Sequence, residues 1–306
     1  MTLLTVGTLA IDCVEAPHGE RHEAIGGSAS FLAAAAANFC PVQMVGVIGE
    51  DFPAGELDFF QNRGIDTSGV SRADGKTFHW HGRYEKDPNI RHTVTTDLNV
   101  LTDFRADLPP AFRKTEYVAL GNIDPELQLR VLDQVENPKC VICDTMNYWI
   151  EGRNEALRRM LERVQIISVN DSEARQLSGE HNLVKAARAV RRMGPEYVVI
   201  KRGENGAILF SEDDVYVVMA LPLESVIDPT GAGDSFAGAM MGYIARTGSH
   251  DVATLRKAMI LGNVVASFAV EQFSLDGLRK LTHQQINDRY ALFRKMTYFD
   301  KKLPFA

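Results

Sequence analysis

The sequence has few cysteines, no excess of positive charge and no long apolar run. Its four cysteines among 306 residues include one C-x-x-C pair, Cys140 and Cys143, and no second pair supplies the other ligands of a zinc site. We therefore expect ordinary buried cysteines of an apolar strand. The net charge of -7 argues against binding to nucleic acid or to an anionic membrane surface, and favours a small-molecule partner.

No segment has the composition of a membrane span or a secretory signal. No apolar run reaches the roughly 18 residues that a spanning helix needs. The first residues, MTLLTVG, lack the basic start of a signal peptide. These two absences predict a cytoplasmic protein without a membrane partner.

Two short patterns are similar to site motifs but lack essential parts. His79 and His81 could place two imidazoles on one strand face, but no third metal ligand is in view. Residues 75–77, GKT, look like the end of a P-loop, whose first glycine would have to stand where Val70 is. The residues that follow read as a strand, where a P-loop needs a helix. We expect neither a metal site nor a P-loop here.

The sequence does have short β-branched runs that alternate with helical patterns. Hydrophobic residues make up 45% of the chain and charged residues 24%, which is enough apolar surface for a large core. The alternation predicts an α/β fold with a mostly parallel central sheet and helices on both faces, which binds ligands at the carboxyl ends of its strands. Strands are expected at 3–6, 43–48, 117–120, 141–144, 166–169 and 197–200, and helices at 31–39, 155–164 and 183–193.

Two stretches, 12–25 and 76–101, break this alternation. The first has a turn signal between short polar arms, and the second is rich in threonine, valine and aromatic residues with little helical period. Both look like strands of a small extra sheet. We read them as a β-sheet lid inserted into a single domain, 1–306; ordinary surface hairpins are the alternative.

The stretch 228–239, DPTGAGDSFAGA, has the composition of an anion-binding turn. Gly231, Ala232 and Gly233 let the backbone amides point one way, and a helix expected from Ser235 onward adds the positive end of its dipole. Asp234 at that position would repel a bound phosphate, unless it takes a proton from a nucleophile that approaches the phosphate. The alternative is that Asp234 only caps the helix.

This stretch resembles the carboxyl-terminal signature of the ribokinase family, the PfkB carbohydrate kinases. Other motifs resemble the family's motifs in the expected order, from about residue 6 to about residue 263. They are VGTLAID at 6–12, GGSA at 26–29, NDSE at 170–173, KRGENG at 201–206 and Asn263 in a late helix. The resemblance implies a ribokinase-like fold with a lid over the site, and an ATP- and Mg²⁺-dependent kinase that acts on an alcohol group.

The resemblance also implies roles for residues near the phosphates. Asp234 is the expected general base, and the amides of 231–234 form the expected anion hole. Asn170 and Glu173 would help to place Mg²⁺ through water; the alternative is a strand end before a helix capped by Asp171 or Ser172. Lys201, Gly203, Gly206 and Asn263 are expected to bind the nucleotide, with a hairpin turn as the alternative for the glycines. Asp228 and Thr230 match positions that bind a monovalent cation such as K⁺ in some members; Asp228 could instead brace the loop.

The expected acceptor site lies under the lid. Asp12 would accept hydrogen bonds from two substrate hydroxyls, and Gly26 and Gly27 would let the substrate lie against the backbone. Phe31 stands where sugar kinases of the family usually have an asparagine. With three lid aromatics, it favours a flat nucleoside over a free sugar, although these rings could instead pack the lid or form a dimer contact. The other candidate contacts are Ser28, Asn122 and Asn147, and the lid aromatics are Phe78, Trp80 and Tyr84.

Two further alternatives concern turnover and assembly. A protein of this kind could bind a sugar or nucleotide as a sensor without turnover, but such a protein is expected to lose Asp234, the GAG turn or Glu173, and all three are present. The lid is also a candidate contact for a homodimer.

Overall fold

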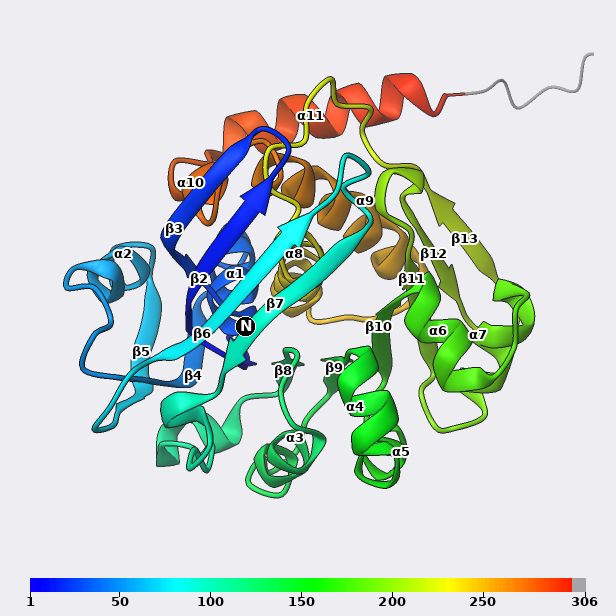
Figure 1. The fold of residues 1–306 in the computed structure, drawn as a ribbon. Helices are drawn as coiled ribbons and strands as arrows, with labels where there is room; N and C mark the ends of the chain where they lie inside the picture. Colours follow the sequence, from blue (N-terminus) through cyan, green and yellow to red (C-terminus); the bar gives the residue numbers. More distant parts are fainter. Residues whose placement is uncertain (299–306) are drawn as a thin grey trace, which may run out of the picture.

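The computed structural model describes residues 1–298 of the chain, and its main element is a nine-stranded sheet (Figure 1). The strand order is β13-β12-β11-β10-β9-β8-β1-β4-β5. All neighbouring pairs from β11 to β5 are parallel, and β12 and β13 add an antiparallel hairpin at one edge. The bounds are β1 Leu3–Val6, β4 Val42–Ile48, β5 Ile65–Arg72, β8 Tyr117–Leu120, β9 Cys140–Asp144, β10 Ile166–Asn170, β11 Tyr197–Lys201, β12 Ala207–Phe210 and β13 Val215–Val218.

The central strands are apolar on both sides because both faces of the sheet are covered. Successive residues face opposite cores: Leu3 packs with one cluster and Leu4 with the other, and both are fully buried. One core lies under α1 Ser28–Ala36, α8 Ala232–Thr247, α9 Val252–Ala269 and α11 His283–Met296. The other lies under α3 Pro125–Leu132, α5 Asn154–Leu161, α6 Asp171–Ser178 and α7 Leu183–Arg191. The shorter helices are α2 Glu56–Asn62, α4 Asn147–Gly152 and α10 Asp276–Arg279.

Small residues bring α8 against α1. A Cβ on Gly238 would lie 2.3 Å from the Leu32 carbonyl oxygen, and one on Gly242 would lie 2.8 Å from that of Ala36. Helix α1 is rich in alanine, so its side chains are also small where it meets α8. All nine of its residues are buried. The sequence after the GAG turn therefore fixes how closely α8 packs, and with it where the helix begins.

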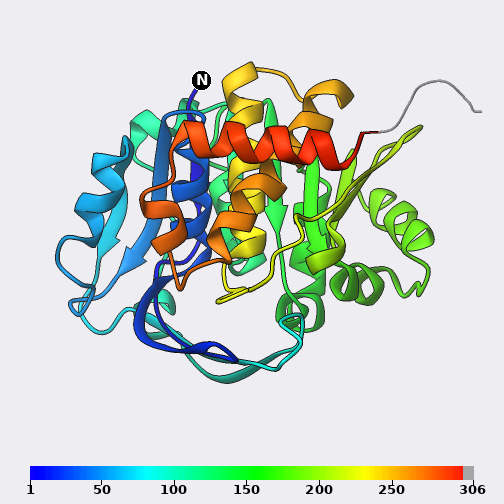
Figure 2. The ribbon, with the colours of Figure 1, turned by 90° about the horizontal axis from the view of Figure 1, so that it is seen from above.

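The lid is a second sheet, with strand order β3-β2-β6-β7. Its strands β2 Ala10–Ala16, β3 Gly19–Gly26, β6 Phe78–Tyr84 and β7 Arg91–Asp97 come from the two expected insertions. The first insertion begins two residues earlier than predicted, and the second ends in a 3-10 turn, Asn99–Leu101, instead of a strand. Strands β2 and β6 pair in parallel, whereas the outer pairs are antiparallel. Figure 2 shows the lid as a separate layer below the sheet edge where the strands end.

The six predicted strands of the main sheet are confirmed to within one residue at each end. Strands β5, β12 and β13 were not predicted, and all three lie at or next to the edges of the main sheet. Strand β5, IDTSGVSR, buries only Ile65 and Thr67. An edge strand with one exposed side has too few apolar residues to be distinguished from a loop by composition.

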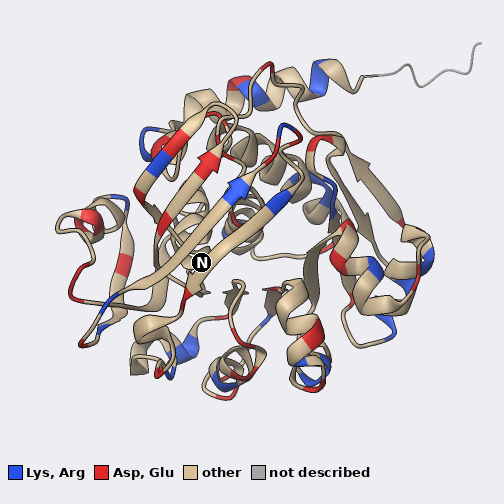
Figure 3. Ribbon diagram, viewed as in Figure 1, with Lys and Arg blue, Asp and Glu red and all other residues tan. Residues whose placement is uncertain are grey.

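Helix α9 meets the length and composition of a membrane span, contrary to our expectation that no segment would. Half of it is buried within the fold, where it packs on α8 and α11. A core helix of a globular domain gives the same signal, so this helix is weak evidence for a membrane. Acidic and basic residues are interspersed over the helices and the lid (Figure 3).

Candidate active site

The N-terminus of α8 lies at the carboxyl edge of the main sheet, behind the lid in Figure 1. The helix begins at Ala232 and not at Ser235 as predicted, because Gly231 takes a left-handed conformation (φ 73°) and serves as the N-cap. The Ala232 amide donates to the Pro229 carbonyl (3.2 Å). The first-turn amides of Gly233 and Asp234 have no carbonyl acceptor in the described part of the chain. This end of the helix can therefore receive an anion.

Asp234 is the third residue of α8, and it is partly buried. Since Gly231 holds the N-cap position, Asp234 is not the cap. Burial raises the pKa of Asp234 to about 7, and the charge of Asp144 adds to this effect. The cations Lys201 and Arg91 partly offset it. A carboxyl with such a pKa can accept a proton near neutral pH, as a general base must.

Asp144 and Lys201 form a buried ion pair beside this helix end. Lys201 ends β11 and Asp144 ends β9, and the Lys201 Nζ lies 2.5 Å from the Asp144 Oδ2. Their side chains are 18% and 11% exposed. A Cβ on Gly233 would lie 3.0 Å from Nζ, so the ammonium group rests against the first turn of α8. Lys201 was predicted as a site residue, whereas Asp144 was not; the available signal for Asp144 was an acid at the end of the apolar run CVICD.

Asn170 and Glu173 form a capping box at the start of α6. The Asn170 Oδ1 accepts from the Glu173 amide (2.8 Å), and the Glu173 Oε2 accepts from the Asn170 amide (2.8 Å). The helix cap is thus Asn170 and not Asp171 or Ser172. Burial, followed by the charge of Asp144, raises the pKa of Glu173 to about 7.

The two glycines of the KRGENG stretch lie in the turn between the antiparallel strands β11 and β12. Both have positive φ, 53° at Gly203 and 77° at Gly206. A Cβ on Gly203 would lie 1.9 Å from the Oδ1 of Asn89, so the turn between β6 and β7 of the lid reaches this loop. Asn263 lies in α9, half-buried, and its side-chain amide donates to the Met259 carbonyl (3.2 Å).

Asp12 lies in lid strand β2, packed against the glycines of the GGSA stretch. A Cβ on Gly26 would lie 1.8 Å from the Asp12 Oδ2, and one on Gly27 would lie 2.3 Å from the Thr8 carbonyl oxygen. Asp12 is 3% exposed, and its Oδ1 has no hydrogen-bond partner in residues 1–298. Burial, followed by the charges of Asp228 and Asp234, raises its pKa. A buried acceptor without a partner is suited to a ligand hydroxyl.

The inner face of the lid carries aromatic side chains beside Asp12. Trp80 is the register partner of Asp12 on β6, so the two side chains share a face. The Tyr84 hydroxyl lies 3.1 Å from that of Thr230, in the loop before α8. Phe78 is half-buried on the same strand. Phe31 is 1% exposed and lies under Gly231, where a Cβ would be 2.4 Å from its ring.

The opposite face of the lid holds the two histidines. The His81 Nε2 lies 2.8 Å from the Glu15 Oε1, and the His79 Nδ1 lies 3.8 Å from the Asp97 Oδ2. Within residues 1–298, no group of three His, Cys, Asp or Glu side chains is arranged to hold a metal ion. The four cysteines are free and buried, and burial raises the pKa of Cys140 to about 12.

Three candidate substrate contacts have different surroundings. The Ser28 Oγ accepts from the Thr8 amide (3.1 Å) and donates to the Asn122 carbonyl (3.3 Å). The Asn122 side chain accepts from the Trp149 Nε1 (2.9 Å). Ser28 and Asn122 therefore hold the fold together at the sheet edge, whereas Asn147 is exposed at the start of α4.

Asp228 braces the loop before α8. It is 1% exposed and accepts from the amides of Thr230 (2.8 Å) and Ser274 (3.0 Å). The Ser274 hydroxyl donates to the Ile25 carbonyl (2.5 Å) at the end of lid strand β3. This network ties the loop to the lid.

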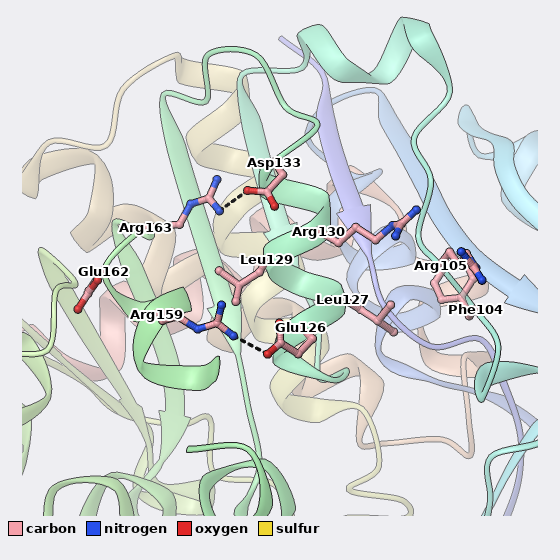
Figure 4. Close-up of a pocket in the computed structure, with 10 residues that line it drawn as sticks. All are labelled: Phe104, Arg105, Glu126, Leu127, Leu129, Arg130, Asp133, Arg159, Glu162 and Arg163. Carbon is pink, nitrogen blue, oxygen red and sulfur yellow. Dashed lines mark hydrogen bonds and ion pairs between the residues drawn. The ribbon is translucent and has the colours of Figure 1, made fainter. Parts of the chain in front are cut away.

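A cavity of about 820 Å³ is lined by none of the site residues described above. It lies between α3, α5 and the segment around Phe104 (Figure 4). Its charges pair with one another, as in Arg159 with Glu126 (2.5 Å) and Arg163 with Asp133 (2.6 Å). It does not contain the glycine turn or Asp234, so we do not assign the chemistry to it.

The main parallel sheet, its two layers of helices and the small β-sheet lid over the strand ends place the chain among α/β proteins with a lidded site. The family model of the pfkB family carbohydrate kinases matches residues 2–279, and the chain belongs to this family. The protein is therefore a kinase of the ribokinase family.

Its relatives include nucleoside kinases. The cytidine kinase of Thermococcus kodakarensis is 31% identical over 252 residues, covering 80% of this chain and 89% of the relative. The nucleoside kinase of Methanocaldococcus jannaschii is 24% identical over 238 residues, covering 75% and 73%.

Solved structures share the ribokinase-like fold. A putative ribokinase II from Escherichia coli has a TM-score of 0.79 at 18% identity, covering 95% of this chain and 99% of that one. The nucleoside kinase of Burkholderia thailandensis in complex with inosine has a TM-score of 0.74 at 20% identity, covering 95% and 98%.

Proposed function

We propose that the protein is a nucleoside kinase that transfers the γ-phosphoryl group of ATP to a hydroxyl group of the nucleoside, with Mg²⁺. The observation that carries the proposal is Asp234, whose carboxyl has a pKa of about 7 and lies in the first turn of α8, where the amides of Gly233 and Asp234 have no carbonyl acceptor in residues 1–298. A base and an anion site in one helix turn are what in-line phosphoryl transfer requires.

In the proposed reaction, Asp234 accepts the proton of the acceptor hydroxyl as its oxygen attacks the γ-phosphorus. The new oxygen–phosphorus bond forms while the bond to the ADP oxygen breaks. The amides of Gly233 and Asp234, with the α8 dipole, stabilise negative charge on the transferring group. One such preorganised donor commonly contributes about 2.7–4 kcal/mol to transition-state stabilisation.

Mg²⁺ fits this proposal as an ion held mostly by water and by the ATP phosphates. The nearby oxygen donors are the carboxyls of Glu173, Asp144 and Asp234, which act on one another electrostatically. Mg²⁺ prefers oxygen donors and keeps several waters. Residues 1–298 contain no ready-made cluster of protein ligands, so Glu173 would contact the ion's water shell. The bound ion would neutralise phosphate charge.

A nucleoside acceptor is supported by the lid and by the relatives. Asp12 offers a buried, unpartnered oxygen to a ribose hydroxyl, and Trp80 stands beside it for stacking on a base. The named activities of the Thermococcus kodakarensis and Methanocaldococcus jannaschii relatives, cytidine kinase and nucleoside kinase, point the same way.

An ADP-release assay over acceptors tests the proposal. Purified protein with ATP and Mg²⁺ is given adenosine, inosine, guanosine, cytidine, ribose or fructose in separate reactions. We expect release with at least one nucleoside that exceeds release with either sugar, and loss of release when Mg²⁺ is chelated. ADP release with ribose or fructose but with no nucleoside would show that the acceptor is a sugar. Binding of ATP and an acceptor without ADP release would indicate a sensor.

A further inference from the structure

We propose that Asp144 is a positioning residue for phosphoryl transfer: it holds the Lys201 ammonium against the first turn of α8, where Lys201 neutralises the transferring phosphoryl group. The inference rests on the proposed function and assigns a role to a residue outside the recognised motifs. Asp144 and Lys201 end strands β9 and β11, on either side of β10 in the sheet. The pair therefore bridges the edge at which ligands bind in such sheets.

Lys201 alone would not have a fixed position. A lysine ammonium is a point charge on a flexible stem of four carbons. Here it is 18% exposed, and its hydrogen bond goes to the Asp144 Oδ2 at 2.5 Å. The ammonium also lies against the backbone at Gly233, where a Cβ would approach it to 3.0 Å. The charge is thus fixed beside the amides that face the anion site.

Asp144 is itself held by the fold. Its carbonyl accepts from the Gln128 Nε2 (3.0 Å), which also donates to the Gly121 carbonyl (2.9 Å). Gln128 is fully buried and joins the ends of β8 and β9. The position of Asp144 is therefore set by the sheet, and Asp144 in turn sets the position of Lys201.

Two other carboxyls compete for the same ammonium. The charges of Asp144, Glu173 and Asp234 together raise the pKa of Lys201 against the effect of burial. If Asp144 did not hold Lys201, the ammonium would pair with Asp234 or Glu173. Pairing with Asp234 would occupy the oxygen that receives the acceptor proton. Asp144 keeps the cation for the phosphoryl group and leaves Asp234 for the hydroxyl.

In the transfer step, Lys201 keeps its proton and forms no bond to phosphorus. The acceptor oxygen forms the new bond to phosphorus, the ADP oxygen leaves, and the acceptor proton goes to Asp234. The ammonium lowers the barrier by acting on charge that develops in a water-poor site. Removing it should lower kcat more than it raises the KM of the acceptor.

A double-mutant cycle tests this coupling. Asp144→Asn, Lys201→Met and the double variant are compared by ADP release, using whichever acceptor the wild type phosphorylates. We expect Lys201→Met to lower kcat by roughly 10²–10³-fold and Asp144→Asn to lower it by at least about tenfold. In both variants the acceptor KM should stay within about threefold of wild type. The double variant should be no slower than Lys201→Met.

Matched controls separate positioning from folding. Asp133→Asn breaks a 2.6 Å ion pair with Arg163 on the far helices and should leave kcat unchanged. The melting temperature and the calorimetric titration with ADP show whether each variant is folded and still binds nucleotide. If Asp144→Asn does not fold, Asp144→Ser is used in the same cycle.

Two results would overturn the inference: wild-type kcat in a folded Asp144 variant, or losses that multiply in the double variant. Failure of this inference can be distinguished from failure of the proposed function. A wild type that phosphorylates only a sugar would refute the nucleoside proposal and still allow the cycle to be measured.

Discussion

The hydroxyl of Tyr84, on lid strand β6, lies 3.1 Å from the hydroxyl of Thr230, in the loop that leads into α8. Thr230 is in turn fixed by Asp228, which also reaches the segment that contacts lid strand β3. The lid and the loop that leads into α8 are therefore parts of one hydrogen-bonded unit.

Tyr84→Phe should loosen the contact between the lid and the loop before α8. One hydrogen bond contributes about 0.5–1.5 kcal/mol, so we expect the acceptor KM to rise by roughly two- to tenfold. ATP hydrolysis without acceptor should increase, because the lid excludes water less well. Steady-state kinetics with and without acceptor measures both. Tyr298→Phe, at a side chain that is 78% exposed, is the control; identical behaviour of the two variants would show that the contact has no role in closure.

Asp234→Asn should abolish most turnover while substrates still bind. The amide keeps the size of the side chain but cannot accept the hydroxyl proton, and general bases contribute roughly 10²–10⁴-fold to rate. Calorimetric titration with ADP and acceptor checks binding, and ADP release checks turnover. Asp213→Asn, an exposed acid in the β12–β13 turn, should behave as wild type. Turnover near the wild-type value would remove Asp234 as the base.

The pH profile should have an acid limb set by Asp234. Its pKa is raised to about 7, so the base is protonated and inactive below that pH. We expect kcat/KM to rise about tenfold per pH unit below neutrality and to level off above it. A profile that is flat from pH 5 to 8 would contradict this role.

The contribution of Glu173 to folding stability should decrease as the pH rises, whereas the activity that depends on Asp234 should increase. Its folded-state pKa of about 7 exceeds the ordinary 4.5, so protonation favours the folded state. That contribution is complete below the ordinary pKa and is lost as the pH rises through 7. Glu173→Gln keeps the capping box and should raise the melting temperature at pH 8 but hardly at pH 5. Glu155→Gln, at an exposed position on α5, should show no such difference; an equal gain at both pH values would contradict the assignment.

Trp80→Ala should impair acceptor binding specifically. Stacking of a base on an aromatic ring is worth about 1–3 kcal/mol, so the nucleoside KM should rise at least about fivefold while the ATP KM stays constant. His81→Ala, on the same strand but facing Glu15, is the matched control. Equal changes in both variants would indicate damage to the lid and not a lost stacking surface.

The elements that sequence reasoning located are those whose chemistry is local. The buried strands have continuous β-branched runs, and the GAG turn carries its glycines within a few residues. The start of α8 was misplaced because the left-handed conformation of Gly231 allows the helix to begin three residues earlier. Asp144 was missed because its partner Lys201 lies 57 residues away, and only the sheet order brings them together. Strand β5 was missed because an edge strand buries too few residues.

The parallel pairing of β2 with β6 has a consequence for folding. Its register joins Ala10 to Phe78, and β4, α2 and β5 lie between them in the chain. If the two halves of the lid paired before these elements had folded, they would close a long loop without other contacts, which is entropically unfavourable. We therefore expect the lid to be completed late in folding. A chain that stops just before this step would keep the main sheet and lack a complete lid.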